Sequence, residues 1–175
     1  MSMRLRHRLL ICALLFAAPL AWGASCDITT RVQPLDRGEI SYRTAGSGPD
    51  VVLLHGLFAQ KEQWDEVICG LAGAGLRATA PDLPGYGQSS GFGVEVYALE
   101  SQRDTLDAFL TRIGVKRLHV AGNSMGGAIA ALYARQHPDR VRSLAFIGGP
   151  LGITGWGPAL FGAIKSGINP FIPTT

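Results

Sequence analysis

The sequence carries little charge for a globular protein and has few histidines. Charged residues make up 17% of the 175 positions, where about 25% is usual, and only four residues are histidine. Three of the 16 basic residues, Arg4, Arg6 and Arg8, lie at the amino terminus, which leaves 13 basic residues against 13 acidic ones. The rest of the chain is therefore neutral and has no basic patch laced with aromatic residues. We expect no nucleic-acid partner.

Cysteine is also scarce, with three residues in the chain. There is no cluster of metal-ligating residues and no glycine-rich phosphate loop, so we expect no metal and no cofactor. Cys26 and Cys69 are able to pair in an oxidising compartment. Cys69 falls within an expected helix, however, where a buried free thiol is the commoner state, and the pattern favours that state over a disulfide.

One long hydrophobic run is present, from Leu9 to Leu20, directly after the basic amino terminus. It is short for a membrane span, which needs about 20 residues. The pattern is typical of a secretory signal peptide over residues 1–25, with cleavage after Gly23 or Ser25. We expect export to the periplasm or the medium, with lipid attachment and membrane anchoring through Cys26 as an alternative.

Strand and helix patterns alternate along the remaining chain, which predicts an α/β fold with a doubly wound, mostly parallel sheet. The expected strands are 39–45, which is antiparallel, and 50–54, 76–79, 117–121 and 141–147. The expected helices are 61–74, 94–113 and 125–136. We assign residues 26–152 to the folded core and residues 153–175 to the start of a helical lid.

A serine flanked by glycines joins the expected strand 117–121 to an alanine-rich helix, in the sequence RLHVAGNSMGGAIAALYA. A serine at such a sharp turn has its hydroxyl clear of the sheet, and Gly122 and Gly126 provide the room that the turn needs. The N–H groups at the start of the helix are unpaired and would stabilise an oxyanion. We expect the N–H group of Met125 to be the first donor. The pattern predicts that Ser124 is a catalytic nucleophile, in preference to an ordinary helix N-cap.

The pentapeptide G-x-S-x-G occurs a second time, around Ser89. A proline-glycine loop precedes this copy and Gly93 follows it, so neither a strand nor a helix holds the serine. We interpret Ser89 as a loop residue.

Two more segments accompany the serine. In DVVLLHGLF, residues 50–58, an apolar strand breaks into a loop at His55 and Gly56, and APDLPGYGQS, residues 80–89, follows the next strand. With GNSMGG, these motifs make the stretch from about residue 31 to 152 resemble the α/β-hydrolase fold superfamily. The resemblance implies that the N–H group after His-Gly, here that of Leu57 with Phe58 as the nearby alternative, is a second oxyanion donor, and that the later motif shapes the rim.

Within that superfamily, GNSMGG and AIAALYARQHPDRVRSLAFIGG look like the monoacylglycerol lipase and esterase branch, or the hydrolases of meta-cleavage products. Serine at position 124 argues against the haloalkane dehalogenase and epoxide hydrolase branches, because those enzymes use a carboxylate nucleophile.

A serine hydrolase of this kind needs an acid and then a histidine after the nucleophile. Only His137 and Asp139 follow Ser124, and we expect them at the turn that stops the elbow helix, far from the serine. His55 belongs to the oxyanion loop, and we expect His119 to be a packed core residue.

Two acids upstream, Asp82 and Asp104, could approach the serine, but neither occupies a position that the superfamily uses for the triad acid. We therefore expect an amino-terminal fragment, or a truncated gene product, of a secreted serine hydrolase that lacks the last strands of the sheet and is inactive by itself.

The reaction implied by the resemblance is acyl transfer from a carboxylic ester to Ser124. Apolar acyl chains are the expected substrates, because the lid segment carries a stripe at helical spacing, which ordinary lid packing would also explain: Trp156, Leu160, Phe161 and Ile164. A carbon–carbon bond hydrolase or a cofactor-free perhydrolase of the same fold stays open, as does a non-catalytic binding protein.

Overall fold

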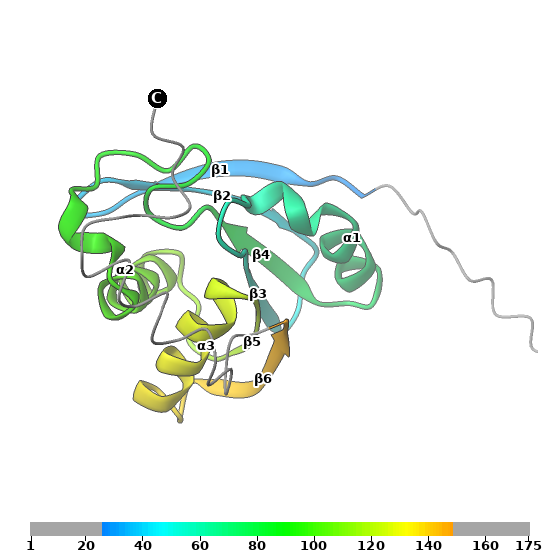
Figure 1. Cartoon of the computed structure of the whole chain (residues 1–175). Coiled ribbons are helices and arrows are strands. Elements are labelled where there is room, and N and C mark those ends of the chain that lie inside the picture. The colour runs from blue at the N-terminus through cyan, green and yellow to red at the C-terminus, as the bar shows by residue number, and fades with distance from the viewer. Residues whose placement is uncertain (1–25, 149–175) are drawn as a thin grey trace, which may run out of the picture.

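A six-stranded sheet with helices on both faces forms the protein, in a computed structural model that describes residues 26–148 (Figure 1). The strand order is β1-β2-β4-β3-β5-β6. β1 pairs antiparallel with β2 and β2 with β4, while the β4–β3, β3–β5 and β5–β6 pairs are parallel. The strands are β1 Thr29–Pro34, β2 Glu39–Ala45, β3 Asp50–Leu54, β4 Arg77–Pro81, β5 Leu118–Asn123 and β6 Val141–Ile147. The α-helices are α1 Asp65–Gly73, α2 Leu99–Arg112 and α3 Met125–Gln136, with short 3₁₀ helices η1 Lys61–Trp64 and η2 Val94–Tyr97.

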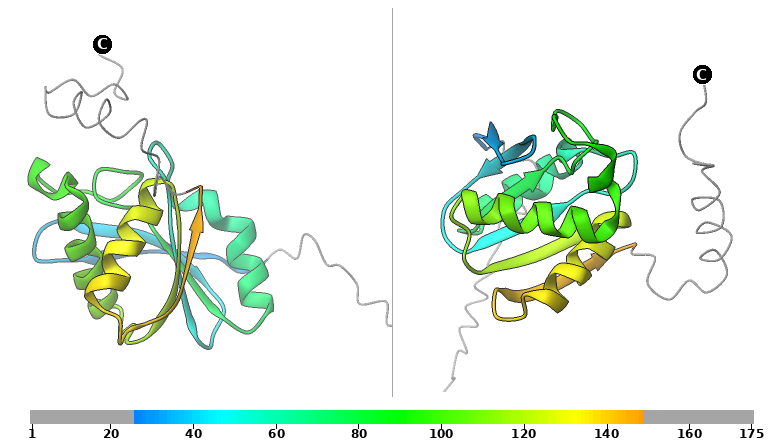
Figure 2. Two further views of the ribbon diagram at one scale, coloured as in Figure 1. Left: turned by 60° about the horizontal axis from the view of Figure 1, so that its bottom comes forward. Right: turned by 90° about the vertical axis from the view of Figure 1, so that its left-hand side faces the viewer.

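The sheet lies between α1 on one face and α2 with α3 on the other (Figure 2). Strand β3 is in the middle, and its apolar side chains alternate between two cores. Val52 and Leu54 pack with residues of α2 and α3, whereas Val51 and Leu53 pack with Trp64 and α1. A strand buried on both faces explains why this segment is a continuous apolar run.

The doubly wound, mostly parallel architecture expected from the sequence is confirmed. Two expected helices are each divided into a 3₁₀ turn and an α-helix: 61–74 changes type at Asp65, and 94–113 is interrupted by Ala98, which is extended at φ −64° and ψ 145°. Strand β1 was not expected, because its residues TTRVQP are mostly exposed and carry no apolar alternation.

The expectation of a free thiol at Cys69 is wrong, since Cys26 and Cys69 form a disulfide with their Cα atoms 5.3 Å apart. The reason is the unexpected strand β1. Its pairing with β2 brings the preceding residues, Cys26 and Ile28, against the core under α1, where Cys69 is only half-buried.

The expected signal peptide, residues 1–25, and the expected lid, residues 153–175, lie outside the described residues. Within 26–148, no helix has the length and apolar character needed to cross a membrane.

Candidate active site

Strand β5 ends in a sharp turn at Ser124, from which α3 starts directly. Ser124 has φ 49° and ψ −114°, in a region that a residue with a Cβ rarely adopts. Its N–H group donates to Ile147 O at 3.1 Å, and its carbonyl accepts the N–H groups of Gly127 and Ala128 at 3.0 and 3.2 Å. Strain of this kind persists only where the surroundings fix the backbone, and it is concentrated at functional sites.

The two glycines expected to make room for the turn are both required by close backbone packing. A Cβ on Gly122 would overlap the carbonyl oxygen of Gly126, and a Cβ on Gly126 would overlap those of Leu54 and His55. The first turn of α3 therefore rests on the end of β3. This packing brings Met125, half-buried, beside the loop that leaves β3.

The β3–η1 loop, residues 55–60, lies against the serine. A Cβ placed on Gly56 would be 3.3 Å from Ser124 Cβ, so no side chain separates the loop from Ser124. The next residues, Leu57 and Phe58, have exposed side chains, and Phe58 has a positive φ of 60°. The structure thus brings the residues expected to supply the oxyanion donors next to the elbow.

His55 is fully buried at the start of this loop and holds it to the β4–η2 loop, residues 82–93. Its Nε2 accepts the N–H group of Leu83 at 3.0 Å, which leaves the proton on Nδ1 to donate to Gly56 O at 2.8 Å. Burial lowers the pKa of His55, which favours this neutral form. His55 therefore lies in the loop to which its sequence context assigns it, and it supports that loop through these two hydrogen bonds.

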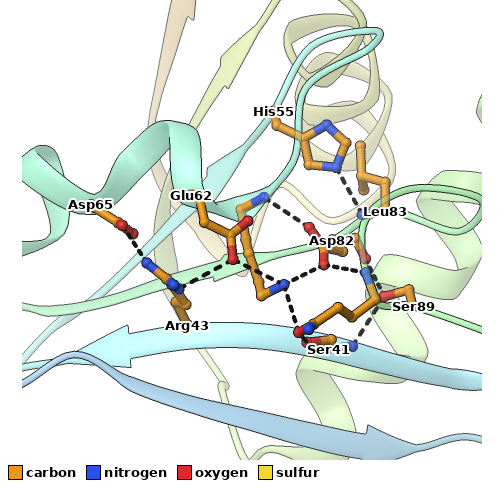
Figure 3. A network of polar contacts seen from close by, with 10 residues as sticks. Ser41, Arg43, His55, Glu62, Asp65, Asp82, Leu83 and Ser89 are labelled. Carbon is orange, nitrogen blue, oxygen red and sulfur yellow. Dashed lines mark hydrogen bonds and ion pairs between the residues drawn. The ribbon is translucent and has the colours of Figure 1, made fainter.

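A buried ion pair between Lys61, the first residue of η1, and Asp82 forms a second link to the β4–η2 loop. Figure 3 shows the network of polar contacts around Asp82. The lysine Nζ lies 2.6 Å from Asp82 Oδ2, and the side chains are 1% and 0% exposed. Asp82 is therefore held within the protein by Lys61. Sequence reasoning missed Lys61, because a lysine at the start of a helix gives no indication of burial.

The second G-x-S-x-G copy belongs to the same network. Ser89 Oγ donates to Asp82 O at 2.7 Å and accepts the Ser41 N–H group at 3.0 Å, fixing the β4–η2 loop to strand β2. Its interpretation as a loop residue is confirmed.

The two other described histidines lie elsewhere. His119 is half-buried and not packed in the core as expected, because no helix among residues 26–148 covers this part of the β5–β6 face; its Nδ1 lies 2.7 Å from Ser143 Oγ. His137 follows α3 as its C-cap, with its ring 4.7 Å from that of Tyr133 and its Nε2 3.8 Å from Asp107 Oδ1. The helix-stop interpretation of His137 is confirmed.

A groove of about 290 Å³ is present at another place in the described part of the chain. It is lined mainly by residues of β1, β2 and β4, including Arg31 and Arg77, together with Asp27 just before β1, and by none from the elbow. Residues 26–148 also contain no group of three or more His, Cys, Asp or Glu side chains placed to hold a metal ion.

Residues 49–162 match the sequence profile of the family described as alpha/beta hydrolase fold. Monoacylglycerol lipase abhd6-B of Xenopus laevis is 35% identical over 104 residues, which are 58% of this chain and 31% of that protein. The 2-hydroxy-6-oxo-6-phenylhexa-2,4-dienoate hydrolase of Comamonas testosteroni is 32% identical over 135 residues, 72% of this chain and 46% of that protein. Epoxide hydrolases and a haloalkane dehalogenase are also similar in sequence.

Among solved structures, a membrane phospholipase A described as a bacterial virulence factor superposes with a TM-score of 0.71. It is 39% identical, and the match covers 82% of this chain and 46% of that one. The chain thus spans less than half the length of these three similar proteins.

Proposed function

The chain belongs to the alpha/beta hydrolase fold family, and we propose that it is the nucleophile-bearing part of a serine hydrolase that acts on carboxylic esters. One observation carries the proposal: Ser124 has a strained, left-handed backbone at a strand-to-helix turn, and Gly56 packs directly against it. An ordinary helix N-cap has an extended backbone and needs no such strain.

The proposed reaction is acyl transfer. Ser124 Oγ attacks the carbonyl carbon of the ester, the N–H groups of Leu57 and Met125 stabilise the oxyanion, and the alcohol leaves. Water then attacks the acyl-enzyme and releases the acid. Backbone donors at a helix N-terminus and in a fixed loop suit this chemistry because they need no reorganisation as the charge develops.

The base and acid of the triad, we propose, lie outside these 175 residues. The three described histidines contact other residues than Ser124: His55 contacts Leu83, His119 contacts Ser143, and His137 lies near Asp107. Residues 149–175 contain no histidine, aspartate or glutamate. Without a base, the serine of a triad contributes almost nothing, because triad members act as a unit.

Esters of apolar acids are the proposed substrates. The support is the names of two similar proteins, a monoacylglycerol lipase and a membrane phospholipase A, together with the apolar stripe of residues 156–164. A carbon–carbon bond hydrolase is the second candidate, because the Comamonas protein is named as the hydrolase of an oxo-dienoate, which has no ester bond, and its match extends over 72% of this chain.

Export through the amino-terminal signal is the proposed route, and the Cys26–Cys69 disulfide supports an oxidising destination. The bond also bears on anchoring: a thiol in a disulfide has no free Sγ for a lipid thioether. In the disulfide-bonded form, therefore, Cys26 is not a lipid anchor.

The first experiment is to sequence the gene through and beyond the codon for Thr175 and to assay the 175-residue chain and any longer product on p-nitrophenyl butyrate. We expect the 175-residue chain to show no turnover above its Ser124→Ala variant. In a longer product containing the acid and histidine, Ser124→Ala should lower kcat by about 10⁴- to 10⁶-fold. Appreciable hydrolysis by the 175-residue chain that is lost on Ser124→Ala would contradict the placement of the base outside it.

A further inference from the structure

We propose that the buried Lys61–Asp82 ion pair sets the position of the β3–η1 loop relative to the nucleophile, which makes Lys61 a positioning residue. The catalytic meaning of this role rests on the proposed function, since it assumes that the N–H group of Leu57 binds an oxyanion. The structural part rests only on the contacts of described residues.

The Asp82 carboxylate accepts three hydrogen bonds, from the first residue of η1 and from the β4–η2 loop. Lys61 supplies two of them: its backbone N–H donates to Oδ1 at 2.8 Å, and its ammonium donates to Oδ2 at 2.6 Å. The N–H group of Gln88 donates to Oδ2 at 2.8 Å. Because a carboxylate held by three fixed donors has one orientation, it ties the start of η1 to the β4–η2 loop.

The ammonium of Lys61 has three oxygen partners. Besides Asp82 it contacts Gln88 Oε1 at 3.1 Å and Glu62 Oε1 at 3.2 Å. Burying an ammonium group that is 1% exposed would be costly without such partners. Burying such a pair adds little to stability compared with apolar side chains of similar volume, so its value lies in the geometry it enforces.

The position of the pair along the chain connects it to the active site. The β3–η1 loop is fixed to the β4–η2 loop twice, by His55 on Leu83 at its beginning and by Lys61, the residue directly after it, on Asp82. Between these anchors lie only residues 56–60, which include Leu57 and contact Ser124 through Gly56. An oxyanion donor has to be held to within about 0.5 Å, and two anchors with only five residues between them provide such restraint.

The β4–η2 loop is shaped around the carboxylate. A Cβ on Gly87, whose φ is 53°, would overlap the Asp82 carboxyl group. The loop therefore closes on the ion pair at a position where only glycine fits, and Figure 3 shows the resulting network between the loops and strand β2.

Hydrogen–deuterium exchange on the 175-residue chain tests the proposal with three variants. Lys61→Met removes the ammonium. Lys61→Met with Asp82→Asn also removes the uncompensated carboxylate while keeping its shape. Arg77→Met is the matched control, because it breaks the half-exposed Arg77–Asp50 ion pair at the other end of β3 and β4.

In both Lys61 variants we expect exchange to rise at least tenfold in peptides covering residues 55–62 and 82–90, with β5 unchanged. The control should leave both loops as in the wild type. The double variant should melt at a higher temperature than Lys61→Met, because no buried charge is left unpaired, and yet keep the fast loop exchange.

If loop exchange in the double variant returns to the wild-type rate together with stability, Lys61 is only structural and the proposal fails. The proposal also fails if Arg77→Met raises loop exchange as much as Lys61→Met does. If Lys61→Met does not fold, the double variant and the control decide the matter by themselves. Exchange does not depend on the chemistry of Ser124, so failure of the proposed function, seen as hydrolysis insensitive to Ser124→Ala in a longer product, is a separate outcome.

Discussion

His55 and Leu83 join two loops through one hydrogen bond, in which the buried imidazole Nε2 accepts the Leu83 N–H group at 3.0 Å. The bond exists only while Nε2 carries no proton, since a protonated imidazole has two donors and no acceptor. The contact between the β3–η1 and β4–η2 loops is therefore linked to the protonation state of His55.

This linkage predicts a pH-dependent stability. Burial lowers the pKa of His55 below its ordinary value of 6.5, so the unfolded chain takes up the proton first as the pH falls. The contribution of neutral His55 to the free energy of unfolding is complete above about pH 6.5 and is lost progressively as the pH falls from there towards the folded-state pKa. Urea unfolding between pH 8 and pH 5 should show this decline. The decline of the unfolding free energy with pH should be smaller in His55→Gln and should be retained in the control His119→Gln. A decline in His55→Gln as steep as in the wild type would contradict the link between His55 protonation and stability.

Substitution of Gly126 should disrupt the elbow. A Cβ there would overlap the carbonyl oxygens of Leu54 and His55, so Gly126→Ala should lower the free energy of unfolding by about 3 kcal/mol or more. Gly70, in α1, has nothing within 4 Å of an added Cβ, and Gly70→Ala should raise it by about 0.5–1 kcal/mol. Denaturant titration of the two variants measures the contrast, and a loss of similar size in both would argue against the packing at Gly126.

The backbone strain at Ser124 is open to a direct measurement. Ser124→Gly and Ser124→Ala both remove the hydroxyl, but only glycine adopts φ 49° without strain. The glycine variant should exceed the alanine variant in unfolding free energy by about 1 kcal/mol. The same pair of changes at Ser143, in strand β6, should have the opposite order, because glycine weakens a strand interior. Alanine more stable than glycine at position 124 would mean that the turn is not strained.

The disulfide should make a large contribution to stability. It closes a chain segment with a sequence separation of 43 residues, for which the chain-entropy estimate is about 4 kcal/mol. The double variant Cys26→Ser with Cys69→Ser should melt at a lower temperature than the oxidised wild type. Reductant should lower the melting temperature of the wild type and leave the double variant unchanged; insensitivity of the wild type to reductant would show that the thiols are not paired.

Much of the architecture and the centre of the candidate site could be predicted from the sequence, because the deciding features are local. The strand ranges 39–45, 50–54 and 141–147 and the helix 125–136 agree with the structure, and Ser124 lies at the expected turn. Strand β1 was missed because an exposed edge strand carries no apolar alternation, and the helix expected over 94–113 was too long because no residue type indicates the extended Ala98.

Local sequence patterns account for the strand-to-helix turn at Ser124 and for the doubly wound sheet, since glycine spacing and apolar periodicity act within a few residues of the chain. Three features follow only from the packing of distant segments: the Cys26–Cys69 bond, the neutral His55 held by Leu83, and the burial of Lys61 against Asp82. Each of these joins residues more than 20 positions apart. Whether such a pair meets depends on how strands and loops pack, because that packing sets both the distance between the groups and their access to water.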